Sequence, residues 1–324
     1  MVKLIRCRLK SRHCVYVLEM RLVSFSLGSQ QPHVGVLAED YVVDLTAAYV
    51  ADGRSLARGM RQLLEEGEEA LEFAASAAAS GLWRLALSAV KLLAPIYDPE
   101  KILCVGMNYR DHCTEQNFPI PEVPVLFSKF ASAIIASGEP IPYDAAETKE
   151  LDFEVELVVV IGRGGKHIPV ADAAAHIVGY TVAHDVSARD LQMKTNNGQW
   201  LLGKTGDGFA PIGPAIVTSD ELSDAEQLGI RCFVNGKLMQ QSNTRELVHG
   251  PAQVVAYASR FMTLKPGDLI FTGTPGGVGC FRKPPIWLKD GDEVICEIDC
   301  IGRITNRVHA MPAAIGPACK RAKL

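Results

Sequence analysis

The chain has 324 residues, a formal net charge of −4, 48% hydrophobic residues and 22% charged residues. This balance gives no electrostatic basis for binding nucleic acid or an anionic membrane, and no apolar run reaches the roughly 20 residues of a membrane-spanning helix. We therefore expect a globular protein with one large and one small domain. Its nine cysteines contain no CxxC pair, which favours reduced, mostly buried thiols of an intracellular protein.

The two ends of the chain carry possible targeting signals. Residues 1–19 contain several Lys and Arg before the first acid, Glu19, which is typical of an organelle presequence and equally of a plain basic extension. The last three residues, Ala322-Lys323-Leu324, resemble a peroxisomal address of small, basic and Leu residues. We predict an organellar protein, favouring the mitochondrion over a peroxisome-like organelle, with the cytoplasm still open. The tail at 310–324 is predicted to be disordered.

Residues 20–97 predict a small N-terminal α/β domain. Short apolar segments separated by turns indicate strands within 20–52. Within 55–78, Leu, Met and Ala recur mostly three and four positions apart, which predicts a helix. Pro95 and Pro99 then mark a boundary, and a larger domain is predicted at 98–309.

The larger domain has the pattern of a β-rich core. Val155–Ile161 is strongly apolar, and Asn235-Gly236 between apolar arms predicts a hairpin. Further strands are predicted at 269–271 and 293–298, with short helices near 171–177 and 250–262. Mixed elements of this kind predict an α+β fold and not a doubly wound parallel sheet.

An acidic strand precedes this apolar run. Asp152, Glu154 and Glu156 alternate with apolar residues, so in a strand their carboxylates share one face. That face continues as Val158 and Val160, and so it becomes buried. Clustered buried carboxylates need a neutralising cation, and oxygen ligands suit Mg²⁺ or Mn²⁺. A solvated face on an edge strand explains the same residues equally well.

A third acid and a possible base come from other segments. Asp185 follows the predicted strand at 177–183 and could join the cluster, or it could cap the next helical turn. His112 and Glu115 are three positions apart on a short helix that Asn108 or Asp111 could cap. Glu115 could then orient His112 as a general base. An incidental contact on an exposed helix is the alternative.

Two glycine-containing segments remain. Gly198–Thr205 matches the phosphate-loop pattern GxxxxGK[ST], but Trp200 and Leu201 prefer burial, so we predict no nucleotide site there. Lys204 is better explained as a cation beside the acids, where it could stabilise an enolate oxygen or form a structural ion pair. The segment Thr272–Gly279 could bring backbone N–H groups to a substrate carboxylate, or be a plain turn.

Taken in order, the motifs resemble one family. VGMNYRDHCTEQN, LFSKF, DFEVELVVVIG, AHDVSARDLQ, QWLLGKT and TGTPGGVG are similar to motifs of the fumarylacetoacetate hydrolase superfamily, over residues 98–309. The resemblance implies a mixed β-sandwich or roll catalytic core, a homodimer and bound Mg²⁺ or Mn²⁺, with Asp152 supporting the ligands. It implies the metal ligands Glu154, Glu156 and Asp185, the catalytic residues His112, Glu115 and Lys204, and the substrate contacts Gln192, Gly273 and Thr274.

Together with this resemblance, these residues predict an enzyme that acts on a small 2-oxo acid through an enolate. The ion would chelate the substrate carboxylate and 2-oxo oxygen, and His112 would move a proton at C3. The segments MRLVSF, GKHI, SARDLQM and FRKPP resemble one branch of the superfamily, which implies oxaloacetate keto–enol tautomerisation. The alternatives are hydrolysis of acylpyruvates or fumarylpyruvate, decarboxylation of oxaloacetate, and a metal-stabilised binding protein without turnover.

Overall fold

The computed structural model describes residues 7–10, 13–16, 19–28, 31–195, 197–222 and 224–312. Most of the predicted leader at 1–19, most of the tail at 310–324 and the C-terminal Ala322-Lys323-Leu324 therefore lie outside the described residues. Within the described ranges, no helix has the length and apolar character needed to cross a membrane.

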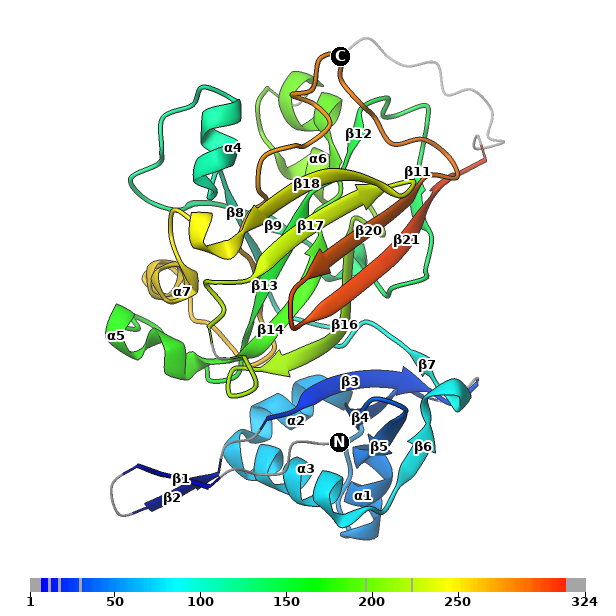
Figure 1. Ribbon diagram of the computed structural model, residues 1–324, viewed down its shortest axis with the longest axis vertical. Coiled ribbons are helices and arrows are strands. Elements are labelled where there is room, and N and C mark those ends of the chain that lie inside the picture. The colour runs from blue at the N-terminus through cyan, green and yellow to red at the C-terminus, as the bar shows by residue number, and fades with distance from the viewer. Residues whose placement is uncertain are drawn as a thin grey trace.

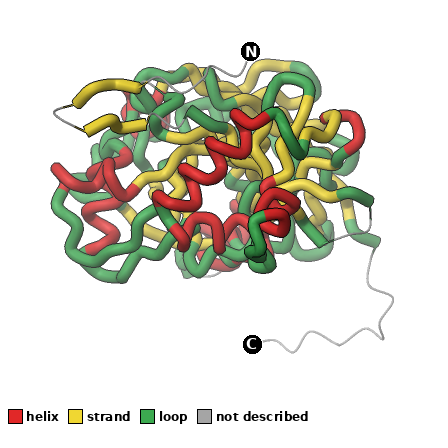
Figure 2. The backbone as a smooth tube through the Cα atoms, turned by 90° about the horizontal axis from the view of Figure 1, so that it is seen from below, coloured by secondary structure: helices red, strands yellow, loops and turns green. Residues whose placement is uncertain are grey.

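The N-terminal segment combines strands and helices as predicted. Its strands after the short hairpin β1 (Cys7–Lys10) and β2 (His13–Tyr16) are β3 (Arg21–Ser26), β4 (His33–Leu37), β5 (Tyr41–Asp44), β6 (Arg84–Ala86) and β7 (Lys91–Leu92). Its helices are α1 (Leu45–Ala51), α2 (Gly59–Glu66) and α3 (Glu68–Ser80). In the view from below, helices lie in front of the strands (Figure 2).

Two local details differ from the sequence prediction. The single helix predicted over 55–78 is divided into α2 and α3 by Gly67, whose positive φ of 71° does not fit a right-handed helix. The segment 45–51, predicted as strand and turn, is the helix α1. Its N-cap is Asp44, whose carboxylate accepts a hydrogen bond from Ala47 N at 3.0 Å.

The largest sheet in the described part of the chain has twelve strands and extends across the predicted domain boundary. Most follow the order β6-β5-β4-β3-β16-β14-β13-β19-β8-β9, and β7 and β10 (Ile134–Ile135) pair at its side. The strand β3 pairs antiparallel with β16, which joins the N-terminal segment to the larger one (Figure 1). The larger segment contributes β8 (Ile102–Gly106), β9 (Val125–Lys129), β13 (Val155–Ile161), β14 (Ile177–His184), β16 (Ala210–Thr218) and β19 (Leu269–Phe271), with β9 at the edge.

A second sheet of five strands packs on β13, β14 and β16 (Figure 1). Its order is β11 (Ile141–Tyr143), β21 (Gly302–Ala310), β20 (Glu293–Ile298), β17 (Gly229–Val234) and β18 (Lys237–Asn243). The predicted hairpin joins β17 to β18, and Asn235 and Gly236 have the positive φ angles, 51° and 75°, of such a turn. The mixed α+β fold is confirmed, and its packed sheets form the β-rich core.

Several short elements lie outside these two sheets. They are α4 (Arg110–Glu115), α5 (Val170–Ala173), α6 (Leu201–Lys204), α7 (Pro251–Ser259) and the strand pair β12 (Leu151–Asp152) and β15 (Ser187–Ala188). The helix predicted near 250–262 is therefore α7. The helix predicted near 171–177 is only the four-residue α5 and a following 3₁₀ turn.

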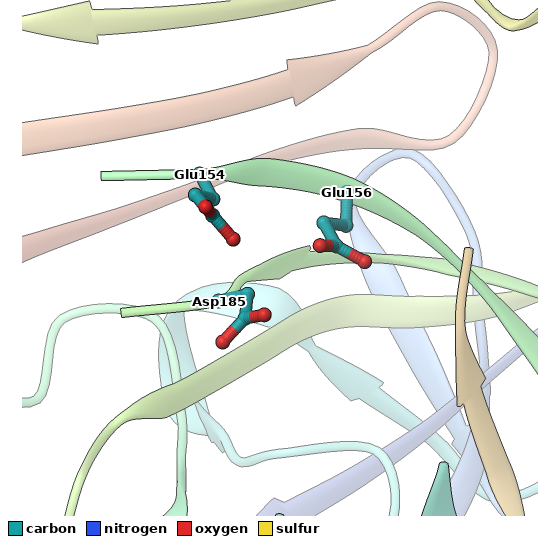
Figure 3. A group of neighbouring side chains, drawn as sticks. All are labelled: Glu154, Glu156 and Asp185. Carbon is teal, nitrogen blue, oxygen red and sulfur yellow. The ribbon is translucent and has the colours of Figure 1, made fainter. Parts of the chain in front are cut away.

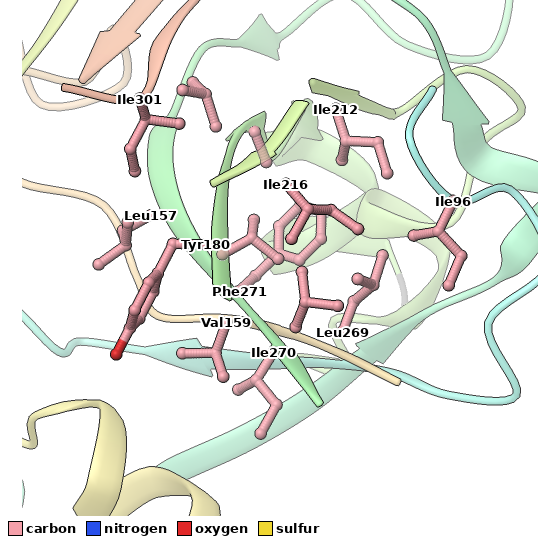
Figure 4. Packing of buried hydrophobic residues seen from close by; sticks show 14 of the residues in the cluster. Ile96, Leu157, Val159, Tyr180, Ile212, Ile216, Leu269, Ile270, Phe271 and Ile301 are labelled. Atoms are coloured by element: carbon pink, nitrogen blue, oxygen red, sulfur yellow. The ribbon is translucent and has the colours of Figure 1, made fainter. Parts of the chain in front are cut away.

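The strand β13 lies inside the sheet, between β14 and β19, and all seven of its residues are buried. Leu157 and Val159 of β13 share one hydrophobic cluster with Ile216, Phe271 and Ile301 (Figure 4). The alternative of a solvated edge strand is therefore wrong. Because Glu156 in this strand and Asp152 and Glu154 just before it are buried, these acids need partners of opposite charge.

Candidate active site

The antiparallel pairing of β13 and β14 brings the three predicted metal ligands together. Val155 faces His184 in the register, so Glu154 and Asp185 lie side by side just outside the two strands, and Asp185 N donates to Glu154 O at 2.8 Å. One carboxylate oxygen each from Glu154, Glu156 and Asp185 lies within 4.8 Å of the others (Figure 3). All three residues are at most 5% exposed.

Lys204 is the cation beside this cluster. Its Nζ lies 2.7 Å from Glu154 Oε2 and 2.8 Å from Asp185 Oδ2. Burial alone would lower the pKa of Lys204, but the charges of Asp185 and Glu154 raise it to about 12. Burial raises the pKa of Glu154, yet Arg189 and Lys204 outweigh this and hold it at about 2. Both groups are therefore charged at neutral pH.

Glu156 has a different environment. Its Oε2 accepts a hydrogen bond from Gly273 N at 2.7 Å. Burial and the nearby charges of Asp185 and Glu154 raise the pKa of Glu156 well above its ordinary value. Glu156 therefore favours a proton or a cation at neutral pH. An oxygen-only donor set with this unbalanced negative charge fits a hard divalent ion such as Mg²⁺ or Mn²⁺.

Arg189, to which the sequence analysis gave no role, ties the cluster to its support. Its guanidinium binds Asp152 Oδ2 at 2.8 Å, Glu154 Oε1, and Gln192 Oε1 at 2.9 Å. Asp152 also accepts hydrogen bonds from Gly279 N and Cys280 N. It lies behind Glu154 and supports it through Arg189, as the resemblance implied.

Lys129 is a second cation that the sequence analysis missed. Its fully buried Nζ lies 2.7 Å from Asp185 Oδ1 and donates to three backbone carbonyls, those of Val186, Lys204 and Phe209. The carboxylate of Asp185 therefore contacts two lysines, and we find no helix capping by it. A usable signal was present in the sequence: a lysine inside an apolar strand, LFSKF, needs a buried acid as its partner.

His112 and Glu115 form the predicted pair on α4. His112 Nδ1 lies 3.3 Å from Glu115 Oε2, and Gly277 N holds the same carboxylate at 3.0 Å. Burial raises the pKa of Glu115, but the hydrogen bonds from His112 and Gly277 bring it below its ordinary value. His112 is only 6% exposed, in contrast to the alternative of an exposed helix.

The cap predicted for this helix is wrong. The N-cap residue of α4 is Tyr109, with no capping side chain. Asn108 instead bonds His249 N and the carbonyl of Thr272, and Asp111 accepts from Ser242 and from Gly276 N. Contacts with distant segments therefore use the two side chains that local sequence suggested as caps.

His112, Glu154 and Glu156 face one cavity of about 70 Å³, whereas Asp185 is not among the residues that line it. Gln192 and Thr274, predicted to contact substrate, also line it. The side chain of Phe127 packs edge-to-face on Trp200 in its apolar wall, with ring centroids 5.2 Å apart. The lining residues with polar or charged side chains are His112, Gln116, Glu154, Glu156, Arg189, Gln192, Trp200, Lys204 and Thr274.

Backbone N–H groups of the segment Thr272–Gly279 donate to carboxylates, and these carboxylates are side chains of the same chain. Gly273 N donates to Glu156, Gly277 N to Glu115 and Gly279 N to Asp152. The hydroxyl of Thr274 donates to the carbonyl of Val155 at 2.9 Å. A contact of Gly273 with a substrate carboxylate stays a prediction.

Comparison with known proteins gives a consistent result. Residues 101–309 match the fumarylacetoacetate (FAA) hydrolase C-terminal family. The chain is 54% identical over 294 residues to the mitochondrial oxaloacetate tautomerase fahd2 of Xenopus laevis, covering 90% of this chain and 91% of that protein. It is 50% identical over 297 residues to the mitochondrial oxaloacetate tautomerase FAHD2A of Homo sapiens, covering 90% and 92%.

Solved structures have the same fold. The maleylpyruvate hydrolase of Sphingobium sp. SYK-6, in complex with manganese(II) and pyruvate, superposes with a TM-score of 0.74 at 32% identity. The match covers 90% of this chain and 100% of that one. The family match and this structure agree with the superfamily that the motifs indicated, and the two sequence relatives agree with its tautomerase branch.

Proposed function

Because this chain belongs to the fumarylacetoacetate hydrolase family, we propose that it is a Mg²⁺- or Mn²⁺-dependent enzyme that interconverts the keto and enol forms of oxaloacetate. The observation that carries the proposal is the single cavity in which His112 faces Glu154 and Glu156. The relatives named as oxaloacetate tautomerases, at 54% and 50% identity, support this substrate.

The metal would be held by Glu154, Glu156 and Asp185. Once bound, such an ion acts as a Lewis acid that stabilises negative charge on an enolate oxygen. The ammonium of Lys204, held by Glu154 and Asp185, adds positive charge on the same side of the cavity.

His112 would carry the proton. Its Nε2 takes a proton from C3 of the keto acid, and Glu115, fixed by Gly277 N, stabilises the imidazolium that forms. The proton is then delivered to the 2-oxygen, which completes the enol. In the reverse direction the proton returns to C3. Because one C–H bond breaks and one O–H bond forms, the reaction needs no water and no oxidant.

Hydrolysis of an acylpyruvate is the second candidate. The similarity to a maleylpyruvate hydrolase, at a TM-score of 0.74, favours it. A hydrolase must also place a water molecule against the substrate carbonyl, whereas a tautomerase excludes water from the enolate. Decarboxylation of oxaloacetate passes through the same enolate and is a third possible outcome of the same assay.

One experiment separates these outcomes. The purified chain is given Mg²⁺ or Mn²⁺, and enol-oxaloacetate absorbance, CO₂ release and acylpyruvate loss are followed in parallel. We expect rapid metal-dependent loss of the enol absorbance that EDTA abolishes. Metal-dependent acylpyruvate cleavage without tautomerisation would assign the hydrolase function instead.

Variants test the roles of the residues. Glu154→Ala and Asp185→Ala should lose Mn²⁺ binding and activity together. His112→Ala should keep Mn²⁺ and oxalate binding while turnover falls by roughly 100-fold or more, the usual contribution of a general base. Unchanged turnover in His112→Ala would remove the histidine from the mechanism. Oxalate binding by a wild-type chain without turnover would favour a binding protein.

Assembly and location extend the proposal. We infer a homodimer from family membership, and light scattering after size exclusion should give twice the 35.1 kDa chain mass.

We infer mitochondrial localisation from the relatives named mitochondrial. Those names lend no support to a peroxisomal location. Imaging of the full chain, with and without residues 1–19, tests the inference, and a cytosolic full chain would contradict it.

A further inference from the structure

Gln116 makes a contact with the proposed base that the mechanism above does not use. It is the C-cap residue of α4, and its backbone N–H donates to the carbonyl of His112. Its side-chain Nε2 lies 2.7 Å from Nε2 of His112 and 3.5 Å from Sδ of Met107. The Gln116 side chain lines the same cavity as Glu154 and Glu156.

The partners of the imidazole define which ring nitrogen carries the hydrogen. Nδ1 faces the Glu115 carboxylate, which can only accept a hydrogen bond, so Nδ1 is the donor. In the neutral ring, Nε2 then has the lone pair, and the amide N–H of Gln116 donates to it. This lone pair is the one that must take the proton from C3. Proton transfer therefore requires the Gln116 amide to leave Nε2.

The released amide has a suitable acceptor in an oxaloacetate-like substrate. In such a molecule the second carboxylate is bonded directly to C3, the carbon that His112 must reach. A donor that lies on Nε2 of His112 is therefore close to that carboxylate once the base approaches C3. The two cations in the cavity wall, Arg189 and Lys204, are already held by acids at the other end of the site.

We propose that Gln116 is a specificity-determining residue: its amide N–H moves from Nε2 of His112 to the substrate carboxylate next to C3. It thereby favours 2-oxo acids that carry a second carboxylate over pyruvate-like acids. The inference rests on the proposed function for the identity of the reacting carbon. Recognition and catalysis are thereby linked. The substrate carboxylate that accepts the Gln116 hydrogen bond also frees Nε2 of His112 to act as the base.

The test uses Gln116→Met, which keeps the length of the side chain and removes the donor. A hydrogen bond to a charged group corresponds to about 10- to 100-fold in affinity. We expect the KM for oxaloacetate to rise by this factor, while inhibition by oxalate, which has no group beyond the chelating end, changes by less than about threefold. Gln116→Glu should weaken oxaloacetate binding further, because it places a negative charge beside the carboxylate. Equal effects on oxaloacetate and oxalate would overturn the inference.

A binding measurement separates this inference from the proposed function. Difluoro-oxaloacetate keeps the second carboxylate but has no hydrogen at C3, so its binding to the Mn²⁺-loaded chain can be measured by calorimetry without turnover. Selective weakening in Gln116→Met supports the inference even if the chain proves to be no tautomerase. Unchanged binding overturns it even if tautomerase activity is found. Thr114→Val, on the exposed side of α4, is the matched control and should behave as wild type.

Discussion

At the scale of single residues, the site has more buried acids than buried cations. Lys204 and Arg189 hold Glu154, and Lys129 and Lys204 hold Asp185, whereas Glu156 is bonded only through Gly273 N among the contacts described. The group comprises the acids Asp152, Glu154, Glu156 and Asp185 and the cations Lys129, Arg189 and Lys204. The excess negative charge is concentrated on Glu156, whose pKa is raised by its burial and by the charges of Asp185 and Glu154.

The raised pKa of Glu156 predicts a pH-dependent stability of the metal-free protein. The folded chain retains a proton on Glu156 that the unfolded chain releases above the ordinary pKa of a glutamate. Its contribution to folding is therefore complete below that ordinary pKa and is lost as the pH rises toward and through the raised value. Glu156→Gln in EDTA should thus gain thermal stability relative to wild type, and the gain should grow from pH 5 to pH 8.

Thermal melting with and without Mn²⁺ checks this prediction. Mn²⁺ should raise the melting temperature of wild type more at pH 8 than at pH 5, because the ion competes with the proton. It should have little effect on Glu156→Gln. If the stability difference between Glu156→Gln and wild type does not change from pH 5 to pH 8, Glu156 is ionised in the folded chain and the prediction is wrong.

The sequence was informative about the acids and much less so about their partners. Alternation placed Glu154 and Glu156 on one face because strand geometry is local. Asp152 supports Glu154 indirectly, because Arg189, 37 residues away in the sequence, binds both carboxylates. Which cation meets which acid depends on such approaches of distant segments. Lys129 was overlooked for this reason, although its apolar neighbours were visible in the sequence.

At the scale of elements, local signals predicted some features and distant contacts decided others. The hairpin at Asn235-Gly236 was predictable because that pair adopts the required positive φ angles. The break at Gly67 was not inferred, because apolar spacing continues through it. The short strand β12 ends at Asp152 and β13 begins at Val155, so the acidic strand is interrupted at Phe153 and Glu154. That interruption lets Glu154 point at Lys204 and Arg189 together.

The loop that follows β19 provides a prediction about close packing. A Cβ atom at Gly279 would lie 2.0 Å from the carbonyl oxygen of Ile286 and 2.6 Å from Oδ1 of Asp152. Gly279→Ala should therefore displace the loop and weaken the bond from Gly279 N to Asp152. We expect a loss of about 1–3 kcal/mol in the free energy of unfolding, measured with urea, and a fall in kcat/KM.

Gly276→Ala is a matched control in the same loop. Its added Cβ would have ordinary contacts, at 3.5 Å from Asp111 and Glu115, and its φ is not positive. The control should stay within about 0.5 kcal/mol of wild type. Equal destabilisation by both substitutions would indicate that the loop tolerates no side chain at all, and that packing against Ile286 is not the cause.

At the scale of the whole molecule, the continuous sheet makes the N-terminal segment part of the catalytic framework. Ile216 of β16 pairs with Leu22 of β3, and Met20 N donates to Thr218 Oγ1 at 3.0 Å. Ser24 Oγ bonds the carbonyl of Pro95, at the predicted boundary. Composition and Pro spacing suggested two domains at 20–97 and 98–309. They could not reveal this pairing, because its partners are almost 200 residues apart.

This continuity predicts that the two segments unfold together. The chain has three tryptophans, Trp83, Trp200 and Trp287, and the first lies in the N-terminal segment. We therefore consider two variants, one that keeps only Trp83 and one that keeps only Trp200. Within each variant, the urea midpoint measured by tryptophan fluorescence should equal the midpoint measured by circular dichroism. An earlier fluorescence transition in the Trp83 variant would show that the N-terminal segment melts independently.

The amides of the glycine segment connect parts of the site that differ in role. Gly273, Gly277 and Gly279 bind, in turn, an acid of the proposed metal cluster, the acid behind the proposed base, and the acid that anchors Arg189. In a glycine-labelled sample, the NMR signals of these three N–H groups can therefore report on each part of the site separately. Loading of the cluster, protonation of the histidine and loosening of the Arg189 support would each shift a different glycine signal within seven residues of chain.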